Sequence, residues 1–426
     1  MRRRGPIAFA LTLSLVVAAL IGGAGAGSCA SGTGAPVSTP PPTPVPPFGS
    51  PSPFPTALVT PSPAPRAPRL GARAAILEDL DTGQVLFERA ARSRRPVASV
   101  TKVMTALLVL EKLSPGDVVT AGRDATGQTG SKLGLAAGER ITVRNLLYAL
   151  LLQSSNDAAV ALADAVAGSV PRFVELMNER AGELGLRDTR FASPNGLDDR
   201  GYSSATDLAA MTREAYGHSL FAQIVRTKTW NIPAPSGPSR HIQNRNALLW
   251  LYPGAIGVKT GFTSPAGRCI IATGGRGETR VLAVVLGEPG EPFDDAATLL
   301  NYGLLEFVRV TLIRLGESVG TVDVQGSPVP AVAGADLSAL VRRDLLGAVG
   351  RRLLGASGLT LPVAVGAPVG TEVSSVAGSP LGSVPAVAAT SVPAPGPAPT
   401  ALSEHPLAAL IRLLRALLRA VLQPFL

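Results

Sequence analysis

The sequence predicts an α/β (α+β) fold in which an antiparallel sheet is flanked by helices and carries a helical lobe, with a small all-β domain at the C-terminal side. Three observations lead to this prediction. A hairpin pattern opens at residue 74, a series of apolar helical runs follows it, and strand-like segments return between residues 256 and 286. Beyond residue 315 short Val-rich segments alternate with Gly and Pro. Strands on both sides of a helical stretch favour a single sheet packed against helices.

The elements of residues 69–315, which form the predicted main folded domain, follow from hydrophobic periodicity. Residues 74–80 and 84–88 have the pattern of a hairpin around the turn Asp81-Thr82-Gly83. The run 143–166 has helical period but contains Asn156-Asp157, where the chain can break. The predicted helices span 100–113, 143–166, 172–184, 205–216 and 293–307, and the predicted later strands span 256–259, 269–273 and 281–286.

Residues 316–391 change character and predict a small β domain. Short strands are expected at 320–324, 362–365, 370–373 and 381–387, between Gly and Pro residues. Residues 316–320 satisfy the pattern G-x-S-x-G of α/β-hydrolases. That pattern requires a strand-to-helix elbow, and strand-like residues follow here instead. No catalytic constellation is expected in this domain.

Composition limits the functional classes. The 426 residues are 46% hydrophobic and 16% charged, which suffices for a sizeable core. The net charge of +9 is concentrated towards the two ends, so the middle lacks the clustered basic face of a nucleic-acid-binding protein. Two cysteines exclude a disulfide framework, and the presence of three histidines in all argues against a multi-histidine metal centre. We therefore expect no metal, no cofactor and no nucleic-acid partner.

The N-terminal residues predict export. Residues 1–30 combine Arg2–Arg4, an apolar run at 7–21 and small residues at 22–28, as in a secretory signal peptide. Cys29 follows a segment loosely similar to a lipobox, so cleavage with and without lipidation of Cys29 are both open. Residues 31–68 form a Pro-rich linker, with 14 prolines between 36 and 68. A tether and a simple disordered leader are both compatible with this composition.

The C-terminal residues predict a membrane contact. After a linker at 392–402, residues 403–426 have the period of an amphipathic helix whose polar stripe carries Arg412, Arg415, Arg419 and Gln423. Crossing a bilayer would bury these arginines, whereas a helix lying in the interface lets them face anionic headgroups. Packing on the protein's own surface is the alternative, which the prolines at 393–399 disfavour. The expected location is the outer face of the cytoplasmic membrane.

Lysine is scarce, which draws attention to the positions that keep it. The chain has five lysines among 39 basic residues. Unlike Arg, a buried Lys can lose its proton and act as a base. Ser99 and Lys102 form the one S-x-x-K pattern, at the start of an apolar helix. A neutral Lys102 there could take the Ser99 proton directly. Taken alone, the pattern is equally compatible with a capped helix that carries a surface lysine.

Two further polar clusters follow in the chain. Ser154-Ser155-Asn156 interrupts an apolar stretch, and polar groups in such a place should have partners or face a cleft. A loop between two helices would also explain it. Lys259-Thr260-Gly261 ends a predicted strand, where Lys and Thr can bind a carboxylate and Gly permits close backbone approach. An ordinary edge-strand lysine is the alternative for this segment.

In this order, S-x-x-K, S-x-N and K-T-G are the signature of the penicillin-interacting serine enzymes. The surrounding residues resemble the D-alanyl-D-alanine carboxypeptidases, low-molecular-mass penicillin-binding proteins of peptidase family S11. The resembling stretches are 98–107, 150–159, 193–197 and 257–269. The resemblance implies a β-lactamase/DD-peptidase-like fold for residues 69–315. It extends more loosely to the C-terminal β domain and the terminal helix, and it does not include the Pro-rich linker.

The resemblance also implies roles. Ser99 would attack the carbonyl of the penultimate D-alanine of a peptidoglycan stem peptide, with Lys102 as general base and Ser154 passing the proton to the leaving D-alanine. Asn156 would hydrogen-bond the substrate backbone. Lys259 and Thr260, with Gly261 beside them, would bind the terminal carboxylate. The oxyanion hole would be the backbone N–H groups of Ser99 and Phe262. β-Lactams would acylate Ser99 as inhibitors.

Three alternatives remain beside the carboxypeptidase. A β-lactamase of the same fold would need a positioned deacylating carboxylate, and no convincing E-x-x-x-N segment lies between Ser154 and Lys259. A DD-endopeptidase of the same fold is not distinguished by the sequence. A non-catalytic peptidoglycan-binding protein would not need Ser99. Arg268 stands where an aromatic residue is common in the family, so substrate preference can differ, and Cys269 is expected to be a buried apolar residue.

Overall fold

The structure is a computed structural model and describes residues 67–394 and 410–416. The predicted signal peptide, most of the Pro-rich linker, Cys29 and much of the terminal helix lie outside the described residues. Residues 410–416 are helical, as the periodicity of 403–426 predicts. No helix within the described residues has the length and apolar character needed to cross a bilayer.

An antiparallel five-stranded sheet forms the centre of the N-terminal folded region, in the order β2-β1-β9-β8-β7. Its N-terminal hairpin is β1 (Ala74–Asp79) and β2 (Val85–Arg89), and its other strands are β7 (Ala255–Thr263), β8 (Gly267–Arg276) and β9 (Thr279–Glu288). β1 pairs with β9 along its whole length, from Ala74 opposite Leu286 to Asp79 opposite Val281. Residues far apart in the sequence therefore share one sheet, as predicted.

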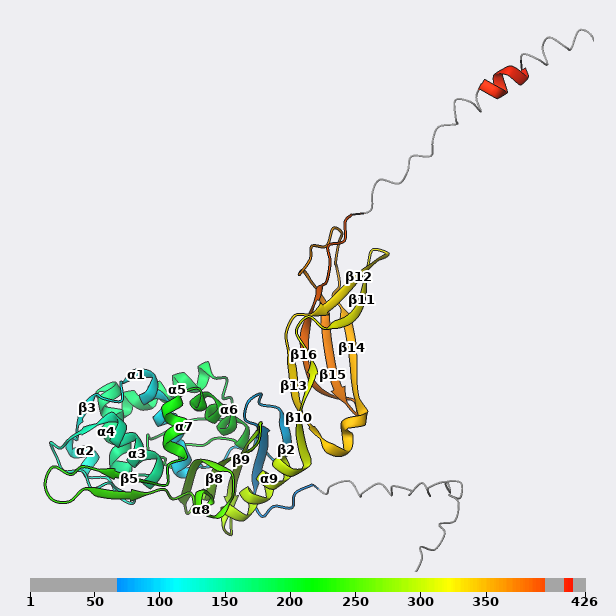
Figure 1. Ribbon diagram of the computed structural model, residues 1–426. Coiled ribbons are helices and arrows are strands. Elements are labelled where there is room, and N and C mark those ends of the chain that lie inside the picture. The colour runs from blue at the N-terminus through cyan, green and yellow to red at the C-terminus, as the bar shows by residue number, and fades with distance from the viewer. Residues whose placement is uncertain (1–66, 395–409, 417–426) are drawn as a thin grey trace, which may run out of the picture. The chain divides into compact units, whose positions relative to one another are not determined.

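The two faces of the sheet belong to different cores. Ile76 and Val284 point into the larger core with the helical lobe, whereas Leu77 and Ala283 point into a smaller core with the closing helix. That helix is α9 (Pro292–Glu306), and Figure 1 shows it beside β8 and β9, with α8 (Leu248–Leu251) nearby. Because β1 is buried on both faces, its residues are all apolar from Ala74 to Leu77, and polar residues begin at Glu78.

The helical lobe contains the predicted helices and several short elements that the sequence did not predict. The predicted ones are α1 (Lys102–Lys112), α3 (Val143–Tyr148), α4 (Asn156–Ala167), α5 (Val170–Glu183) and α6 (Ala205–Tyr216). The additional ones are α2 (Arg123–Thr126), α7 (Ser219–Val225), α8 (Leu248–Leu251) and the strand pairs β3 (Val118–Thr120) with β4 (Arg140–Thr142) and β5 (Thr229–Ile232) with β6 (Arg240–Gln243).

The break predicted at Asn156-Asp157 lies two residues earlier. α3 continues into a π-helical turn at Ala149–Gln153, Ser154 adopts left-handed backbone angles with φ of 65°, and Ser155 is the N-cap of α4. Asn156 and Asp157 thus begin a helix instead of ending one. π-Helical turns are frequent at functional sites, and this one points the following serine out of the helical pattern.

The C-terminal region is all β, as predicted. A two-stranded sheet joins β10 (Phe307–Ile313) to β13 (Leu337–Arg342). A five-stranded sheet has the order β11-β12-β16-β15-β14, formed by β11 (Ser318–Val324), β12 (Ser327–Ala333), β14 (Val349–Gly355), β15 (Pro368–Val376) and β16 (Ser379–Ala388). Strand pairing begins at Phe307, ahead of the boundary expected at residue 316, and Ser318 lies in a strand without a helix after it.

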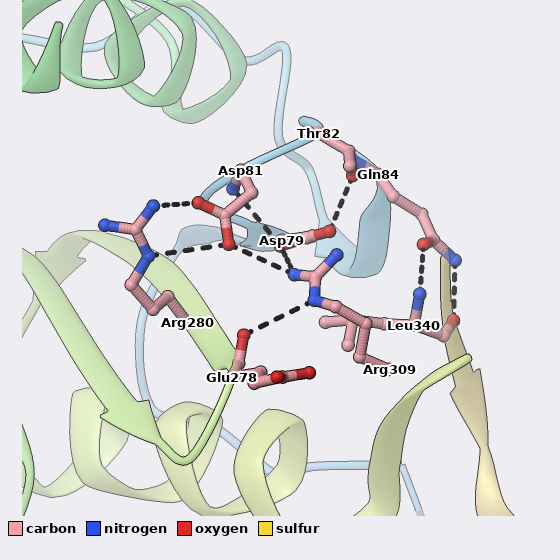
Figure 2. A network of polar contacts seen from close by, with 8 residues as sticks. All are labelled: Asp79, Asp81, Thr82, Gln84, Glu278, Arg280, Arg309 and Leu340. Carbon is pink, nitrogen blue, oxygen red and sulfur yellow. Dashed lines mark hydrogen bonds and ion pairs between the residues drawn. The ribbon is translucent and has the colours of Figure 1, made fainter. Parts of the chain in front are cut away.

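Ion pairs and hydrogen bonds connect β10 and β13 to the first hairpin (Figure 2). Arg309 of β10 donates to the fully buried Asp79 at 2.7 Å and to Asp81 at 3.2 Å, and Arg280 also pairs with Asp81. The side-chain amide of Gln84 exchanges two hydrogen bonds with the backbone of Leu340, at 2.8 and 2.9 Å. Polar contacts at the turn of this hairpin therefore connect the five-stranded sheet of the N-terminal region to the C-terminal β region.

Candidate active site

Ser99 lies in a 3₁₀ turn, Ala98–Thr101, that leads directly into α1. The turn is held by close packing against the segment containing Gly196, whose φ of +77° favours glycine. A Cβ at Gly196 would come within 2.0 Å of the Ala98 carbonyl oxygen. Only a glycine allows this approach, which explains why the short stretch 193–197 belongs to the site.

Lys102 lies one turn after Ser99 and is fully buried. Its Nζ is 2.9 Å from Ser99 Oγ, 2.8 Å from Asn156 Oδ1 and 2.7 Å from the backbone oxygen of Asn195. Burial lowers the pKa of Lys102 well below its ordinary value, and the nearby cations Lys259 and Arg245 lower it further. The structure thus places a readily deprotonated amine against the Ser99 hydroxyl.

The neutral form of Lys102 fits its three partners. A neutral amine has two N–H groups and one lone pair. The Asn195 carbonyl and Asn156 Oδ1 can only accept hydrogen bonds, so they take the two N–H groups. The lone pair is then left for the proton of the Ser99 hydroxyl. The arrangement therefore matches a base that faces a nucleophile, without a histidine.

Asn156 is fixed from several sides. Its Nδ2 donates to the Thr129 carbonyl at 2.7 Å, which assigns Oδ1 to the Lys102 side. Its backbone N–H donates to the Ser131 carbonyl at 2.7 Å. The neighbouring carboxylate of Asp157 accepts the N–H groups of residues 133–135, at 2.8 to 3.1 Å, and so holds the same loop. The start of α4 and the loop at 129–135 form one unit.

Lys259 lies on β7 with only 1% of its surface exposed. Its Nζ donates to the Thr260 carbonyl at 2.6 Å. Burial, with the charge of Arg245 as a smaller cause, lowers the pKa of Lys259 to about 7. Arg245, on the loop after β6, acts on both lysines. Arg245 therefore adds a positive charge beside both lysines, whose own charges are reduced by burial.

Gly261 brings β7 against the nucleophile. A Cβ at this position would lie 3.0 Å from the Ser99 nitrogen and 3.1 Å from the Val97 oxygen. Such contacts are shorter than side chains normally make, so the close approach requires glycine. The Ser99 N–H and the strand residues that follow Gly261 consequently lie beside each other.

These residues meet at one cavity of about 320 Å³. Of the residues predicted from sequence, Ser99, Ser154, Thr260, Gly261 and Phe262 line it, while Lys102, Asn156 and Lys259 are buried around it. The cavity is also lined by Ser131, Arg245, Arg268, Cys269, Glu291, Pro292 and Phe293. Cys269 is fully buried, as expected, and burial raises the pKa of its thiol to about 11. Within residues 67–394 and 410–416, no cluster of His, Cys, Asp and Glu could hold a metal ion.

Sequence reasoning gave no role to Arg245 and Asn195. Asn195 contributes a backbone oxygen, which any residue could supply, and its position inside the family-like stretch 193–197 was the one available signal. Arg245 lies on a loop between two short elements, where no periodicity or motif marks it. Only the folded chain brings it to the two lysines.

The fold and the site define a serine-type hydrolase of the penicillin-interacting class. Residues 61–290 match peptidase family S11, described as D-alanyl-D-alanine carboxypeptidase. The chain is 40% identical over 276 residues to the D-alanyl-D-alanine carboxypeptidase DacD of Salmonella typhimurium, covering 61% of this chain and 69% of that protein. It is 35% identical over 262 residues to DacF of Bacillus subtilis, covering 60% and 67%.

Solved structures agree with this assignment. Penicillin binding protein 5 from Haemophilus influenzae matches with a TM-score of 0.68 and 29% identity, over 77% of this chain and 99% of that chain. The chain therefore belongs to the D-alanyl-D-alanine carboxypeptidase family, peptidase family S11. The resemblance seen in the sequence is confirmed for the family, for the fold and for the enzyme class, which is a hydrolase.

Proposed function

We propose that this enzyme removes the terminal D-alanine of peptidoglycan stem peptides through an acyl-enzyme on Ser99. The observation that carries the proposal is the 2.9 Å contact between Ser99 Oγ and a buried Lys102 whose other partners are acceptors only. Ser99 also lies at the start of a helical segment on the wall of the cavity. A nucleophile and its base are thus paired at a place that a peptide can reach.

The acylation half-reaction follows from these contacts. Lys102 takes the hydroxyl proton while Ser99 Oγ bonds to the carbonyl carbon of the penultimate D-alanine. The backbone N–H groups of Ser99 and Phe262 stabilise the resulting oxyanion. The C–N bond then breaks, and the leaving amine receives the proton from Lys102 by way of the Ser154 hydroxyl. The product D-alanine leaves with its carboxylate intact.

Deacylation uses the same groups in reverse order. A water molecule attacks the ester carbon and gives its proton to Lys102. The bond between the carbonyl carbon and Ser99 Oγ breaks, and Lys102 returns the proton to Ser99. The shortened stem leaves as a carboxylic acid. A β-lactam would acylate Ser99 in the same first step and leave a more slowly hydrolysed ester.

The carboxylate end of the substrate sets its direction. Thr260 lines the cavity, and the cations Lys259 and Arg245 lie around it, which suits the terminal carboxylate. Asn156 uses one N–H of its amide on Thr129 and its oxygen on Lys102, which leaves the second N–H for a contact with the substrate backbone. The substrate would lie along β7 with its carboxylate near Thr260 and its reacting carbonyl near Phe262.

Labelled penicillin and a pentapeptide stem together test this function. We expect one label per molecule and release of the terminal D-alanine, detected by mass spectrometry. Both should be lost in Ser99→Ala and kept in Ser114→Ala, which changes an exposed serine outside the cavity. Labelling of Ser99→Ala at the wild-type level would disprove the assignment, and cleavage of a cross-link instead of the terminal bond would favour the DD-endopeptidase.

We further propose that the enzyme works on the outer face of the cytoplasmic membrane, held there by its C-terminal helix. The support is the signal-like sequence at 1–30 and the amphipathic pattern at 403–426. In the described part of that helix, Leu410, Ile411, Leu413 and Leu414 are exposed. Deletion of 403–426 should reduce sedimentation with membranes, and unchanged sedimentation would exclude this anchor.

A further inference from the structure

An exposed ion pair lies on the wall of the active-site cavity. Arg268, at the start of β8, contacts Glu291 at 3.2 Å, and the two side chains are 45% and 56% exposed. The Arg268 guanidinium also lies over the Phe262 ring, with 5.6 Å to its centroid. All three residues line the same cavity as Ser99. The mechanism above uses only the backbone of Phe262 and neither charged side chain.

The pair lies where the earlier part of the stem peptide must arrive. This step rests on the proposed function, in which the terminal carboxylate is near Thr260 and the reacting carbonyl is near Phe262. The substrate then runs along β7 in the direction from Thr260 to Phe262 and beyond. The preceding stem residue is one step, about 3.8 Å, further on. Arg268 pairs with Phe262 on the adjacent strand, about 4.8 Å away, so a long side chain of that stem residue can reach it.

The chemistry of the pair limits what can bind. Arg268 has five N–H donors, and Glu291 is its ion-pair partner. Because both side chains are about half exposed, their mutual attraction is weak and can be exchanged for a ligand. A lone carboxylate would be repelled by Glu291, and a lone ammonium by Arg268. A group that carries both charges on neighbouring atoms satisfies both side chains at once.

We propose that Arg268 and Glu291 form a specificity subsite for a zwitterionic amino-acid end on the side chain of the stem residue that precedes D-Ala-D-Ala. Arg268 binds the carboxylate of that end through paired N–H donors, and Glu291 binds its ammonium group. The Phe262 ring holds the guanidinium plane in place. The preferred substrate class is a stem that contains a diaminodicarboxylic acid, in preference to one that contains a simple diamino acid.

Three synthetic peptides of the form acetyl-X-D-Ala-D-Ala test this subsite with the full-length protein in detergent. In the first X is 2,6-diaminopimelic acid, in the second lysine, and in the third 2-aminopimelic acid. We expect wild-type kcat/KM for D-alanine release to be about tenfold higher for the first peptide than for the other two. Arg268→Gln should abolish the preference over lysine, and Glu291→Gln should abolish the preference over 2-aminopimelic acid.

Matched controls lie at the opposite end of the same strands. Arg276→Gln, at the end of β8, and Glu278→Gln, in the turn before β9, remove the same charges from exposed positions and should leave the preferences unchanged. The stoichiometry of penicillin labelling checks that each variant is folded. Preferences that persist in Arg268→Gln and Glu291→Gln while labelling and D-alanine release continue would overturn the subsite alone. Absence of D-alanine release from all three peptides in wild type would overturn the proposed function beneath it.

Discussion

The side-chain oxygen of Asn156 lies 2.8 Å from Nζ of Lys102. The opposite end of the same amide is tied to the Thr129 carbonyl at 2.7 Å, so the oxygen cannot turn away without losing that bond. A neutral acceptor in this place orients the amine and does not stabilise its charge as a carboxylate would. Asn156 therefore directs the lone pair of Lys102 to Ser99 without adding a negative charge that would favour the protonated amine.

Replacing this amide by a carboxylate should shift the pH dependence. Asn156→Asp places an anion beside Lys102 and raises the pKa of Lys102, since an opposite charge favours the protonated form. Activity needs the neutral amine, so the acidic limb of the profile of kcat/KM should move to higher pH. At pH 7 we expect a loss of roughly tenfold or more.

A pH series of penicillin acylation rates measures this shift. Asn301→Asp adds the same charge at an exposed residue of α9 and should leave the profile in place. An acidic limb that stays at its wild-type position in Asn156→Asp would show that Lys102 is not the titrating base.

Strand β7 should tolerate no side chain at Gly261. Gly261→Ala would place a Cβ 3.0 Å from the Ser99 nitrogen, which forces the strand and the turn apart. Because a small displacement of reacting groups lowers rates strongly, we expect acylation to fall about a hundredfold. Gly350→Ala, in open space on β14, is the matched control. Stopped-flow labelling with penicillin gives both rates, and equal rates would contradict the close approach.

Much of the fold was predictable because its long elements are strongly periodic. α1, α6 and the hairpin of β1 with β2 lie close to their expected positions. The pairs β3 with β4 and β5 with β6 were missed, since strands of three or four residues carry too little alternation to be recognised. β10 was missed because its residues directly follow a helix of similar apolar character, and only its pairing with β13 defines it.

The site was predictable where local spacing carries the chemistry. Ser99 and Lys102 lie one helical turn apart, so their contact follows from the sequence. The left-handed backbone of Ser154 depends on a π-helical turn that the apolar run does not reveal. Arg245 and Glu291 come to the cavity from a loop and from the residue before α9. Contacts between segments so far apart in the sequence depend on the packing of the whole domain.

Buried Lys259 should make stability depend on pH. Burial lowers its pKa from 10.5 to about 7, so the unfolded chain binds more protons than the folded protein between these values. The cost of the buried charge is fully present below pH 7 and disappears as the pH rises towards 10.5, on the order of a few kcal/mol. Lys259→Met removes this contribution.

Thermal unfolding from pH 6 to pH 10 tests the prediction. The Tm difference between Lys259→Met and wild type should favour the variant most at low pH and shrink as the pH rises. Lys228→Met, which removes a lysine over the exposed Trp250 ring, should show no such trend. A Tm difference that is constant with pH would show that folding does not lower the pKa of Lys259.

The junction between the hairpin and β10 supplies the last prediction (Figure 2). Asp79 is fully buried and its Oδ1 accepts from Arg309 at 2.7 Å. Arg309→Ala leaves this carboxylate with Thr82 Oγ1 and the Asp81 N–H as its remaining donors. Removing one partner of a buried pair costs about 3 kcal/mol, which should lower the Tm by roughly 5 to 10 °C.

Two further variants separate this effect from a general loss of charge. Arg352→Ala, at an exposed position on β14, should leave the Tm within about 1 °C of wild type, since isolated surface charges contribute little. Asp79→Asn combined with Arg309→Ala should recover part of the loss, because no unpaired buried charge remains. Penicillin labelling at 25 °C should persist in Arg309→Ala, since neither Arg309 nor Asp79 lines the cavity. An unchanged Tm in Arg309→Ala would show that the pair does not stabilise the junction, and lost labelling would show that the junction reaches Ser99.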